Sequence, residues 1–346
     1  MIAAVMGAAA LAAAAGAAHD CAPRGGLSFI CGPVGSEDIA RVPGTRWLVA
    51  SGLNLGTPAH LYLIDTRSRR AQPLYPLPGT PKPSHTFDCP GPPDPAKMST
   101  DGLTIRAGAG GRAMLYVANH GGRRAIEMFR LDARGRTPTA TWVGCALMPA
   151  RTLPNAVVAL AGGRLIVSSF HDPDDAGAWD EMSRQAPTGS LWEWRPGAGF
   201  RRIQAGPISG ANGLELSPDE RTLYVSAWSA SKLVVLDLGS LKRREIALDF
   251  LPDNIKRGRD GRLLVGGQRT RVASIAACRG AQCPQDWVVA QVDPVRGIVT
   301  PLVARHGDAR INYACTGLEA GGTLYITNRG DNRIAWLRVS ALPSLD

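Results

Sequence analysis

One short motif recurs six times along this chain of 346 residues, at intervals of roughly 40 to 65 residues. In each copy a small polar or acidic residue stands just ahead of a short apolar run, and a turn and a second, stronger apolar run follow. The copies are Ser36-Glu37-Asp38-Ile39, Thr100-Asp101-Gly102-Leu103, Pro154-Asn155-Ala156-Val157, Ala211-Asn212-Gly213-Leu214, Pro252-Asp253-Asn254-Ile255 and Cys315-Thr316-Gly317-Leu318. A strand-rich unit with this spacing is typical of propeller blades. The repeat therefore predicts an all-β fold, a six-bladed β-propeller with a central metal-binding channel.

The second apolar runs have the composition of strands. They are Trp47-Leu48-Val49-Ala50, Met114-Leu115-Tyr116-Val117, Arg164-Leu165-Ile166-Val167, Leu223-Tyr224-Val225-Ser226, Leu263-Leu264-Val265 and Leu324-Tyr325-Ile326. Length alone allows one large or two ordinary domains, and the repeat favours one. We expect a signal peptide over residues 1–18, an N-terminal extension over 19–30 and the propeller over 31–340.

The N-terminal segment is almost wholly apolar and Ala-rich, and it ends in Ala15-Gly16-Ala17-Ala18. This pattern predicts a secretory signal peptide and a periplasmic or secreted protein. The segment lacks Lys and Arg, so a membrane anchor and a misassigned start remain alternatives. No other segment is apolar and long enough to cross a bilayer, so we expect no stable membrane insertion once the signal is removed.

The seven cysteines fit an oxidising compartment. We predict disulfides between Cys278 and Cys283, between Cys89 and Cys145, and between Cys31 and Cys315. Cys21 is then left unpaired near the mature terminus, although sequence spacing does not fix the connectivity. No cysteine pair has zinc-site spacing with a partner histidine.

The net charge of +10 comes from arginines scattered through the turns. This dispersed pattern indicates a solvated basic surface, and no nucleic-acid motif or aromatic platform accompanies it. We therefore expect a small-molecule substrate and no nucleic-acid partner. The sequence gives no indication of the oligomeric state.

Five oxygen-bearing side chains occupy similar places in four of the repeats: Glu37, Asn155, Asn212, Asp253 and Asn254. In a propeller the first strand of every blade lines the channel, so these side chains are expected to converge. A hard dication such as calcium takes about six to eight oxygen ligands, and two carboxylates with three amides leave the site near charge balance. Each residue alone is more typical of a turn. Their recurrence at one repeat position favours a metal site.

Short motifs around these residues occur in a fixed order. They include Gly35-Ser36-Glu37-Asp38-Ile39, Leu61-Tyr62-Leu63-Ile64-Asp65, Val117-Ala118-Asn119-His120, Leu153-Pro154-Asn155, Ala211-Asn212-Gly213-Leu214 and Asp253-Asn254-Ile255. In this order they resemble the paraoxonase and arylesterase family, six-bladed propellers related more distantly to gluconolactonase and regucalcin. The resemblance extends over about residues 31–338.

The resemblance implies a catalytic calcium ion and a second, structural one. The residues that match the catalytic site are Glu37, Asn155, Asn212, Asp253 and Asn254, and Asp38 matches the structural site. The family usually places an Asp ligand of the structural ion where this chain has Ala156. The second site is therefore expected to be weakened or absent.

The family also presents a pair of histidines that shuttles a proton. Here Asp101 replaces the first histidine, and His120 matches the second. Asp101 is then a general base on water, a further metal ligand or a turn residue. His120 either orients Asp101 or shares its proton, or it is a core histidine bonded to a blade carbonyl. Loss of hydrolysis is also open.

An insertion between Ser169 and Gly189 is acidic and carries Trp179 and Met182. It occupies the place where the family covers the channel mouth, so it is either a lid that excludes water or a mobile surface loop.

These observations together predict a calcium-dependent hydrolase of a lactone or (aryl) ester. In this hypothesis the ion holds the carbonyl oxygen, Asn155 and Asn212 orient it, and Asp101 or Asp253 activates water. The first alternative is a noncatalytic calcium-stabilised propeller that binds a ligand or protein. The second is a strictosidine synthase-like propeller, which works without metal. No serine nucleophile elbow, Walker loop or dinucleotide fingerprint is present.

Overall fold

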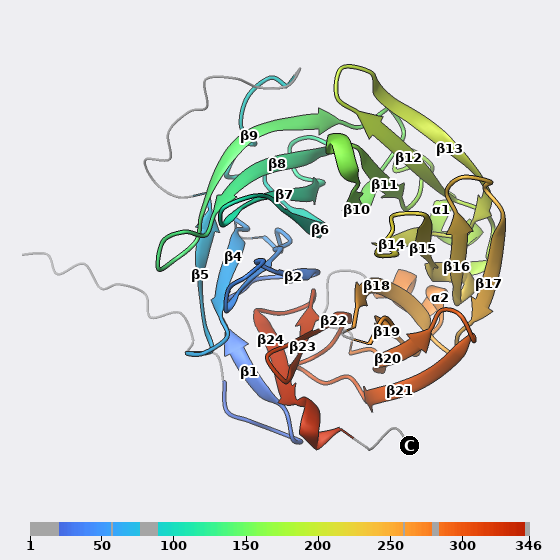
Figure 1. Cartoon of the computed structure of the whole chain (residues 1–346). Coiled ribbons are helices and arrows are strands. Elements are labelled where there is room, and N and C mark those ends of the chain that lie inside the picture. Colours follow the sequence, from blue (N-terminus) through green and yellow to red (C-terminus); the bar gives the residue numbers. More distant parts are fainter. Residues whose placement is uncertain (1–20, 57, 77–88, 259, 279–283, 343–346) are drawn as a thin grey trace, which may run out of the picture.

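The chain folds into a ring of six four-stranded antiparallel sheets around a central channel (Figure 1). The computed structural model describes residues 21–56, 58–76, 89–258, 260–278 and 284–342. The predicted six-bladed β-propeller is confirmed. The predicted signal peptide over residues 1–18 lies outside the described residues.

Each of the first five blades is formed by four consecutive strands. Blades 1 and 2 contain β2 (Ile39–Arg41), β3 (Trp47–Ala50), β4 (Leu61–Asp65), β5 (Arg70–Tyr75), β6 (Thr100–Ala107), β7 (Arg112–Asn119), β8 (Ala125–Asp132) and β9 (Thr139–Leu147). Blades 3 and 4 contain β10 (Pro154–Ala159), β11 (Leu165–Ser169), β12 (Gly189–Arg195), β13 (Gly199–Ile208), β14 (Ala211–Leu216), β15 (Thr222–Ala227), β16 (Lys232–Asp237) and β17 (Arg243–Ala247). Blade 5 contains β18 (Leu251–Arg257), β19 (Leu263–Gln268), β20 (Trp287–Asp293) and β21 (Ile298–Arg305).

Blade 6 closes the ring by joining the two ends of the chain. Its strand order is β1-β24-β23-β22, from β1 (Ser28–Cys31), β22 (Ala314–Ala320), β23 (Thr323–Asn328) and β24 (Arg333–Arg338). The outermost strand β1 pairs antiparallel with β24, with Ser28 opposite Trp336. Residues 28–30, which we expected in the N-terminal extension, therefore belong to the outermost strand of blade 6. Pairing the two ends ties the last blade to the start of the chain.

The hydrophobic core lies between neighbouring blades rather than at the axis. Leu63 of blade 1 and Leu115 of blade 2 are fully buried members of one apolar cluster. Both faces of each sheet therefore pack against other blades, and all four residues of β3 are buried. This explains why the second strands read as continuous apolar runs rather than as alternating ones.

In blades 2 to 6 the recurring polar residues lie inside the innermost strands rather than ahead of them, whereas Glu37 and Asp38 of blade 1 precede β2. In five blades the pairing register shifts at this point, for example between Pro154 and Val157 and between Pro252 and Ile255. A β-bulge leaves an extra residue unpaired and bends the strand, which re-aims its side chains. The repeat motif thus corresponds to a bulge at the start of each of these channel-lining strands.

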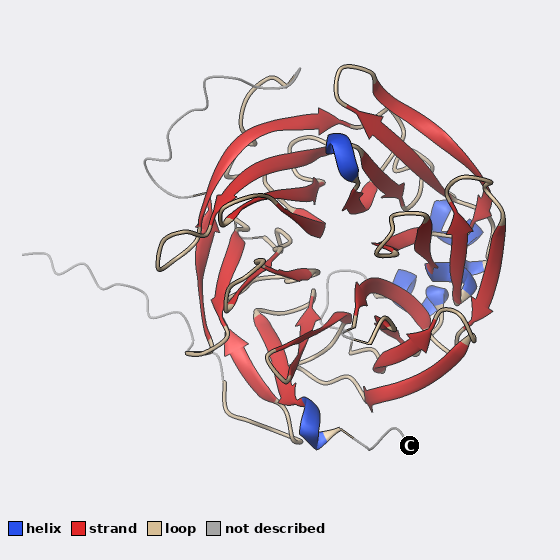
Figure 2. Ribbon diagram, in the orientation of Figure 1, coloured by secondary structure: helices blue, strands red, loops and turns tan. Residues whose placement is uncertain are grey.

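Two short helices lie together at one end of the propeller, over blades 3 to 5 (Figure 2). They are α1 (Ala178–Ser183) and α2 (Val272–Ala277), and single 3-10 turns occur at η1 (Ala161–Gly163), η2 (Trp228–Ala230) and η3 (Val339–Ala341). A cluster of Phe170, Met182, Trp228, Leu251 and Val272 packs beneath the two helices. In the described part of the chain, no helix is long and apolar enough to cross a membrane.

The disulfides differ in part from the prediction. The Cys89–Cys145 bridge is confirmed. The predicted Cys31–Cys315 bridge and the unpaired Cys21 are wrong, because Cys21 is bonded to Cys31 and Cys315 is a free, buried thiol. Cys31 lies on the outermost strand of blade 6 and Cys315 on the innermost. Three strand spacings separate them by about 14 Å, which is too far for a disulfide.

The remaining predicted bridge involves Cys278 and Cys283. Cys278 is disulfide-bonded, whereas Cys283 lies outside the described residues.

Candidate active site

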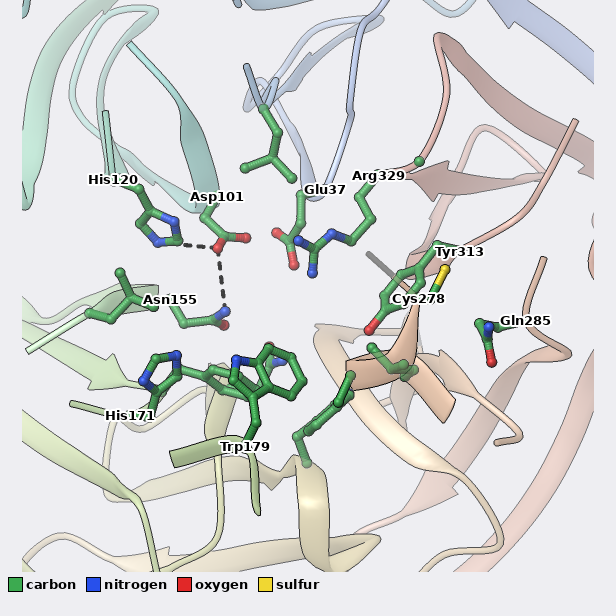
Figure 3. A pocket seen from close by; sticks show the side chains of 18 of the residues that line it. Glu37, Asp101, His120, Asn155, His171, Trp179, Cys278, Gln285, Tyr313 and Arg329 are labelled. Carbon is green, nitrogen blue, oxygen red and sulfur yellow. Dashed lines mark hydrogen bonds and ion pairs between the residues drawn. The ribbon is translucent and has the colours of Figure 1, made fainter. Parts of the chain in front are cut away.

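A cavity of about 680 Å³ opens at the end of the channel where the innermost strands begin (Figure 3). Polar side chains from four blades line it: Glu37, Asp101, Asn155 and Asn212. Its walls carry Phe170, Trp179 of α1, Trp228, Tyr313 and Arg329. The predicted insertion therefore contributes Trp179 to the cavity, whereas Met182 is fully buried in the cluster beneath the helices. The cavity combines a polar floor with a largely aromatic wall.

Five buried oxygens in the channel have no hydrogen-bond partner among the residues that the structure describes. They are Glu37 Oε2, Asp101 Oδ1, Asn155 Oδ1, Asn212 Oδ1 and Asp253 Oδ1, one from each of blades 1 to 5. Burying an unpaired polar oxygen costs roughly 1–3 kcal/mol, and more for a charged group. Oxygens that recur in this way around one axis are chemically suited to hold a cation such as calcium.

Glu37 and Asp253 reach the same point from different blades. Their carboxylate oxygens and the Cys315 thiol lie within 4.8 Å of one another. Glu37 and Asp253 are each 2% exposed, and Cys315 is fully buried. The structure thus brings together the two carboxylates that the sequence analysis placed around one ion. It also adds the Cys315 thiol, which we had predicted to form a disulfide.

Hydrogen bonds from neighbouring amides hold these two carboxylates. Asn254 Nδ2 donates to Glu37 Oε1 at 2.8 Å, and Gln268 Nε2 donates to Asp253 Oδ2 at 2.9 Å. The indole of Trp228 donates in turn to Gln268 Oε1 at 3.1 Å. Each carboxylate therefore has one oxygen held by the protein, and its other oxygen has no hydrogen-bond partner among the described residues. Gln268 was not among the predicted site residues.

Without a cation Glu37 and Asp253 resist ionisation. Burial, together with the charges of Asp101 and Asp253, raises the pKa of Glu37 well above its ordinary value. Burial also raises the pKa of Asp253 to about 6, although the hydrogen bond from Gln268 opposes this shift. Three crowded carboxylates in one buried channel thus favour a bound positive charge.

These raised pKa values predict how the stability of the ion-free protein depends on pH. The folded protein holds protons on Glu37 and Asp253 that the unfolded chain releases at lower pH. Between about pH 4 and pH 6 this contribution to the free energy of unfolding therefore falls as the pH rises. A bound dication favours the ionised carboxylates, so calcium should raise the melting temperature more at about pH 7 than at about pH 5. Thermal unfolding with chelator and with calcium measures this, and equal shifts at both pH values contradict it.

Asp101 and His120 form a pair beside the five oxygens. His120 Nε2 lies 3.2 Å from Asp101 Oδ2 (Figure 3). The same nitrogen contacts the carbonyl oxygen of Pro154. Both neighbours are acceptors, so Nε2 carries a proton and donates it in a hydrogen bond. Asn155 Nδ2 also faces Asp101 Oδ2, at 3.4 Å. His120 therefore orients Asp101, whose Oδ1 is left without a described partner.

Asp38 differs from these residues although it directly follows Glu37. Its Oδ1 accepts from the Ile39 amide and the Thr316 hydroxyl, and its Oδ2 accepts from the Leu103 amide and Lys256 Nζ. Protein donors thus satisfy both oxygens. Because both Asp38 oxygens already accept from protein donors, this residue does not fit the structural calcium site that the resemblance implies.

Apart from Trp179, the aromatic and cationic residues of the cavity wall were not predicted. The rings of Phe170, Trp179 and Trp228 meet edge to face, with centroids 5.4–6.4 Å apart. The Arg329 guanidinium stacks over Tyr313 at 5.0 Å. A repeat signal does mark part of this wall: His120, Phe170, Trp228 and Arg329 are each the first residue after the second strand of a blade.

The fold and the channel define a class of six-bladed propellers with a polar, ion-suited centre. Comparison of sequences then identifies the family. The profile of the SMP-30/Gluconolactonase/LRE-like region family matches residues 60–329, and the chain belongs to this family. No curated protein matches the sequence.

Solved structures show the same fold at low sequence identity. A gluconolactonase from Xanthomonas campestris is 20% identical with a TM-score of 0.55, over 92% of this chain and 89% of that one. The calcium-binding protein regucalcin from Agrobacterium tumefaciens is 13% identical with a TM-score of 0.53, over 89% and 93%. A luciferin-regenerating enzyme is 13% identical with a TM-score of 0.54, over 92% and 97%. At these identities the likeness shows the fold alone.

Proposed function

We propose that this protein hydrolyses a lactone or an ester in the propeller channel with the help of a calcium ion. The observation that supports this most is the ring of five buried oxygens without described partners. Family membership supports it as well, because the family name and one structural neighbour refer to gluconolactonase. A regucalcin neighbour is described as a calcium-binding protein.

Glu37, Asn155, Asn212 and Asp253 would hold the ion through their unpartnered oxygens. Asn254 is the fifth proposed ligand, and its amide now contacts Glu37 Oε1. When bound, the ion supplies Lewis-acid polarisation of the substrate carbonyl and stabilisation of the developing oxyanion. The carboxylate and amide chemistry of this set suits calcium, which prefers oxygen ligands.

The other side chains of the site position and activate the reactants. Asp101 Oδ1 faces the channel and accepts a proton from the attacking water, as a general base. His120 keeps Asp101 in place through its hydrogen bond to Oδ2. Phe170, Trp179 and Trp228 bind the apolar part of the substrate and limit the access of water.

The aromatic wall also suits an aryl ester, in keeping with the resemblance to the paraoxonase and arylesterase family. We include arylesterase activity in the proposal for this reason. Export through the N-terminal signal peptide and a periplasmic or secreted location remain part of it. Disulfides are typical of such compartments, and the structure contains the pairs Cys21–Cys31 and Cys89–Cys145.

Hydrolysis of a panel of lactones and aryl esters, with and without chelator, tests the proposal. We expect turnover of at least one substrate, a loss of about 100-fold or more on chelation, and recovery with added calcium. Tight calcium binding without turnover of any substrate would favour the noncatalytic propeller. Turnover that chelation leaves unchanged would favour a metal-free mechanism.

A further inference from the structure

Lys256 places a cation inside the channel, close to the proposed catalytic centre. Its Nζ donates to Asp38 Oδ2 at 2.8 Å and to the Leu103 carbonyl oxygen at 3.3 Å. We infer that the Lys256 ammonium is a tethered substitute for a second, structural dication, so that the channel of this protein holds one metal ion rather than two.

The contacts of Lys256 and Asp38 link four blades at the axis. Lys256 comes from β18 of blade 5, Asp38 directly precedes β2 of blade 1, and Leu103 belongs to β6 of blade 2. The Thr316 hydroxyl of blade 6 donates to Asp38 Oδ1 at 3.1 Å. The Lys256–Asp38 pair therefore joins segments of four blades at the axis.

The ion pair of Lys256 and Asp38 is buried, as a structural metal site in the channel would be. The side chain of Asp38 is 2% exposed and that of Lys256 is 12% exposed. Removing one partner of such a pair leaves an uncompensated buried charge. Asp38 also accepts from the amides of Ile39 and Leu103, at 2.8 and 2.9 Å, so its remaining lone pairs are used.

The neighbouring position on blade 3 carries no ligand for a second ion. Ala156 packs beside Gly102, where a Cβ on the glycine would lie only 2.7 Å from the Cα of Ala156. The side chain at this position is a methyl group, and its backbone amide is bonded to the Ser168 hydroxyl. Lys256 Nζ contacts the Asp38 carboxylate and the Leu103 carbonyl oxygen, and its charge also acts on the Glu215 carboxylate.

The same pair connects to the catalytic centre through Thr316. Its hydroxyl contacts both the Glu37 carbonyl oxygen at 2.9 Å and Asp38 Oδ1 at 3.1 Å. Thr327 donates to the same Glu37 carbonyl at 2.8 Å. Lys256 therefore holds Asp38, and through it the backbone that carries Glu37, as a positioning residue.

The test compares Lys256→Met with Lys232→Met in the full chain. Lys232 is the matched control because its Nζ is also 2.8 Å from a carboxylate, that of Glu245, but on outer strands with 43% exposure. In the presence of chelator, Lys256→Met should lower the melting temperature by about 5 °C or more beyond the control. Millimolar calcium should raise the melting temperature of Lys256→Met by more than it raises that of the wild type.

Equilibrium dialysis with calcium alone provides the second readout. The wild type should bind one equivalent, and Lys256→Met combined with Ala156→Asp should bind one more than the wild type. If the lysine variants do not fold, Ala156→Asp alone still decides, since Lys256 should keep its calcium stoichiometry at that of the wild type. Two equivalents in the wild type or in Ala156→Asp alone would overturn the inference, as would equal thermal shifts for the two Lys→Met variants.

Neither readout uses a substrate, so the inference is separable from the proposed function. A protein that binds one ion and hydrolyses nothing contradicts the proposed hydrolase but supports the role of Lys256.

Discussion

Replacing Glu37 with Gln is expected to lower kcat/KM for the best lactone or ester by about 1,000-fold. The substitution preserves the shape of the side chain but removes the negative charge that Glu37 carries beside Asp101, Asp253 and Asp38. It also replaces one carboxylate oxygen with an amide NH2 group, which either faces the Asn254 donor or takes the place of Oε2, the oxygen without a partner. The proposed ion then loses one of its two anionic ligands, so calcium affinity should fall together with the rate.

A partly buried carboxylate on an innermost strand, Glu215, provides the control for this experiment. Glu215 lies on β14, three residues after Asn212, and it does not line the cavity. Its two oxygens accept from the backbone amides of Leu216 and Arg257. Glu215→Gln should therefore retain calcium binding and keep its rate within a few-fold of the wild type. A Glu37→Gln variant that binds calcium and turns over substrate like the control would remove Glu37 from the proposed ligand set.

Replacing Asp101 with Asn is expected to lower kcat by about 100- to 1,000-fold while calcium affinity changes little. Asparagine keeps a hydrogen-bonding group opposite His120 but cannot accept a proton from water. His120→Gln should cost only about tenfold, because the amide can still donate to Asp101 Oδ2. The rates of both variants should be measured at saturating calcium over a range of pH.

The alternatives for Asp101 give different results in the same assay. If Asp101 were a ligand of the ion, Asp101→Asn would weaken calcium binding in parallel with the rate. If it were a turn residue, the rate would hardly change and the melting temperature would fall. A rate loss that excess calcium rescues therefore contradicts the role of general base.

The fold could be predicted because every blade has the same pattern of buried and channel-facing strands, which makes the sequence periodic. Every blade buries both faces of its sheet, so the second strands are apolar throughout, as in Trp47–Ala50. Every first strand faces the channel, so its polar residues recur in step with the blades. Glu37 and Asp253 are far apart in sequence, yet the ring brings their carboxylates together. Periodicity alone is sufficient for this part of the site.

Other features depend on which strand of a blade a residue occupies, and the repeat does not show this. The Cys21–Cys31 bridge follows from β1 being the outermost strand of blade 6, which requires knowledge of how the ring closes. The pairing of Asp38 with Lys256 depends on a long side chain that crosses the channel. Lys256 resembles any other strand lysine in the sequence, so no local pattern marks it.

The wall residues Phe170, Trp228 and Arg329 fall between these two cases. They share one repeat position with His120, directly after the second strand. Their side-chain types differ from blade to blade, because each contacts a different part of the cavity. A search for like residues misses them, whereas alignment of the blades by position would have found them.

The most direct test of the central claim is a crystal structure of the calcium-soaked protein with anomalous scattering data. We expect one ion at about 2.3–2.6 Å from oxygens of Glu37, Asp253, Asn155 and Asn212. These are the unpartnered channel oxygens other than that of Asp101, which is assigned to the general base. We also expect no ion between Asp38 and Leu103, where Lys256 lies. A channel without any ion at millimolar calcium, or an ion bound only elsewhere, would contradict the central claim.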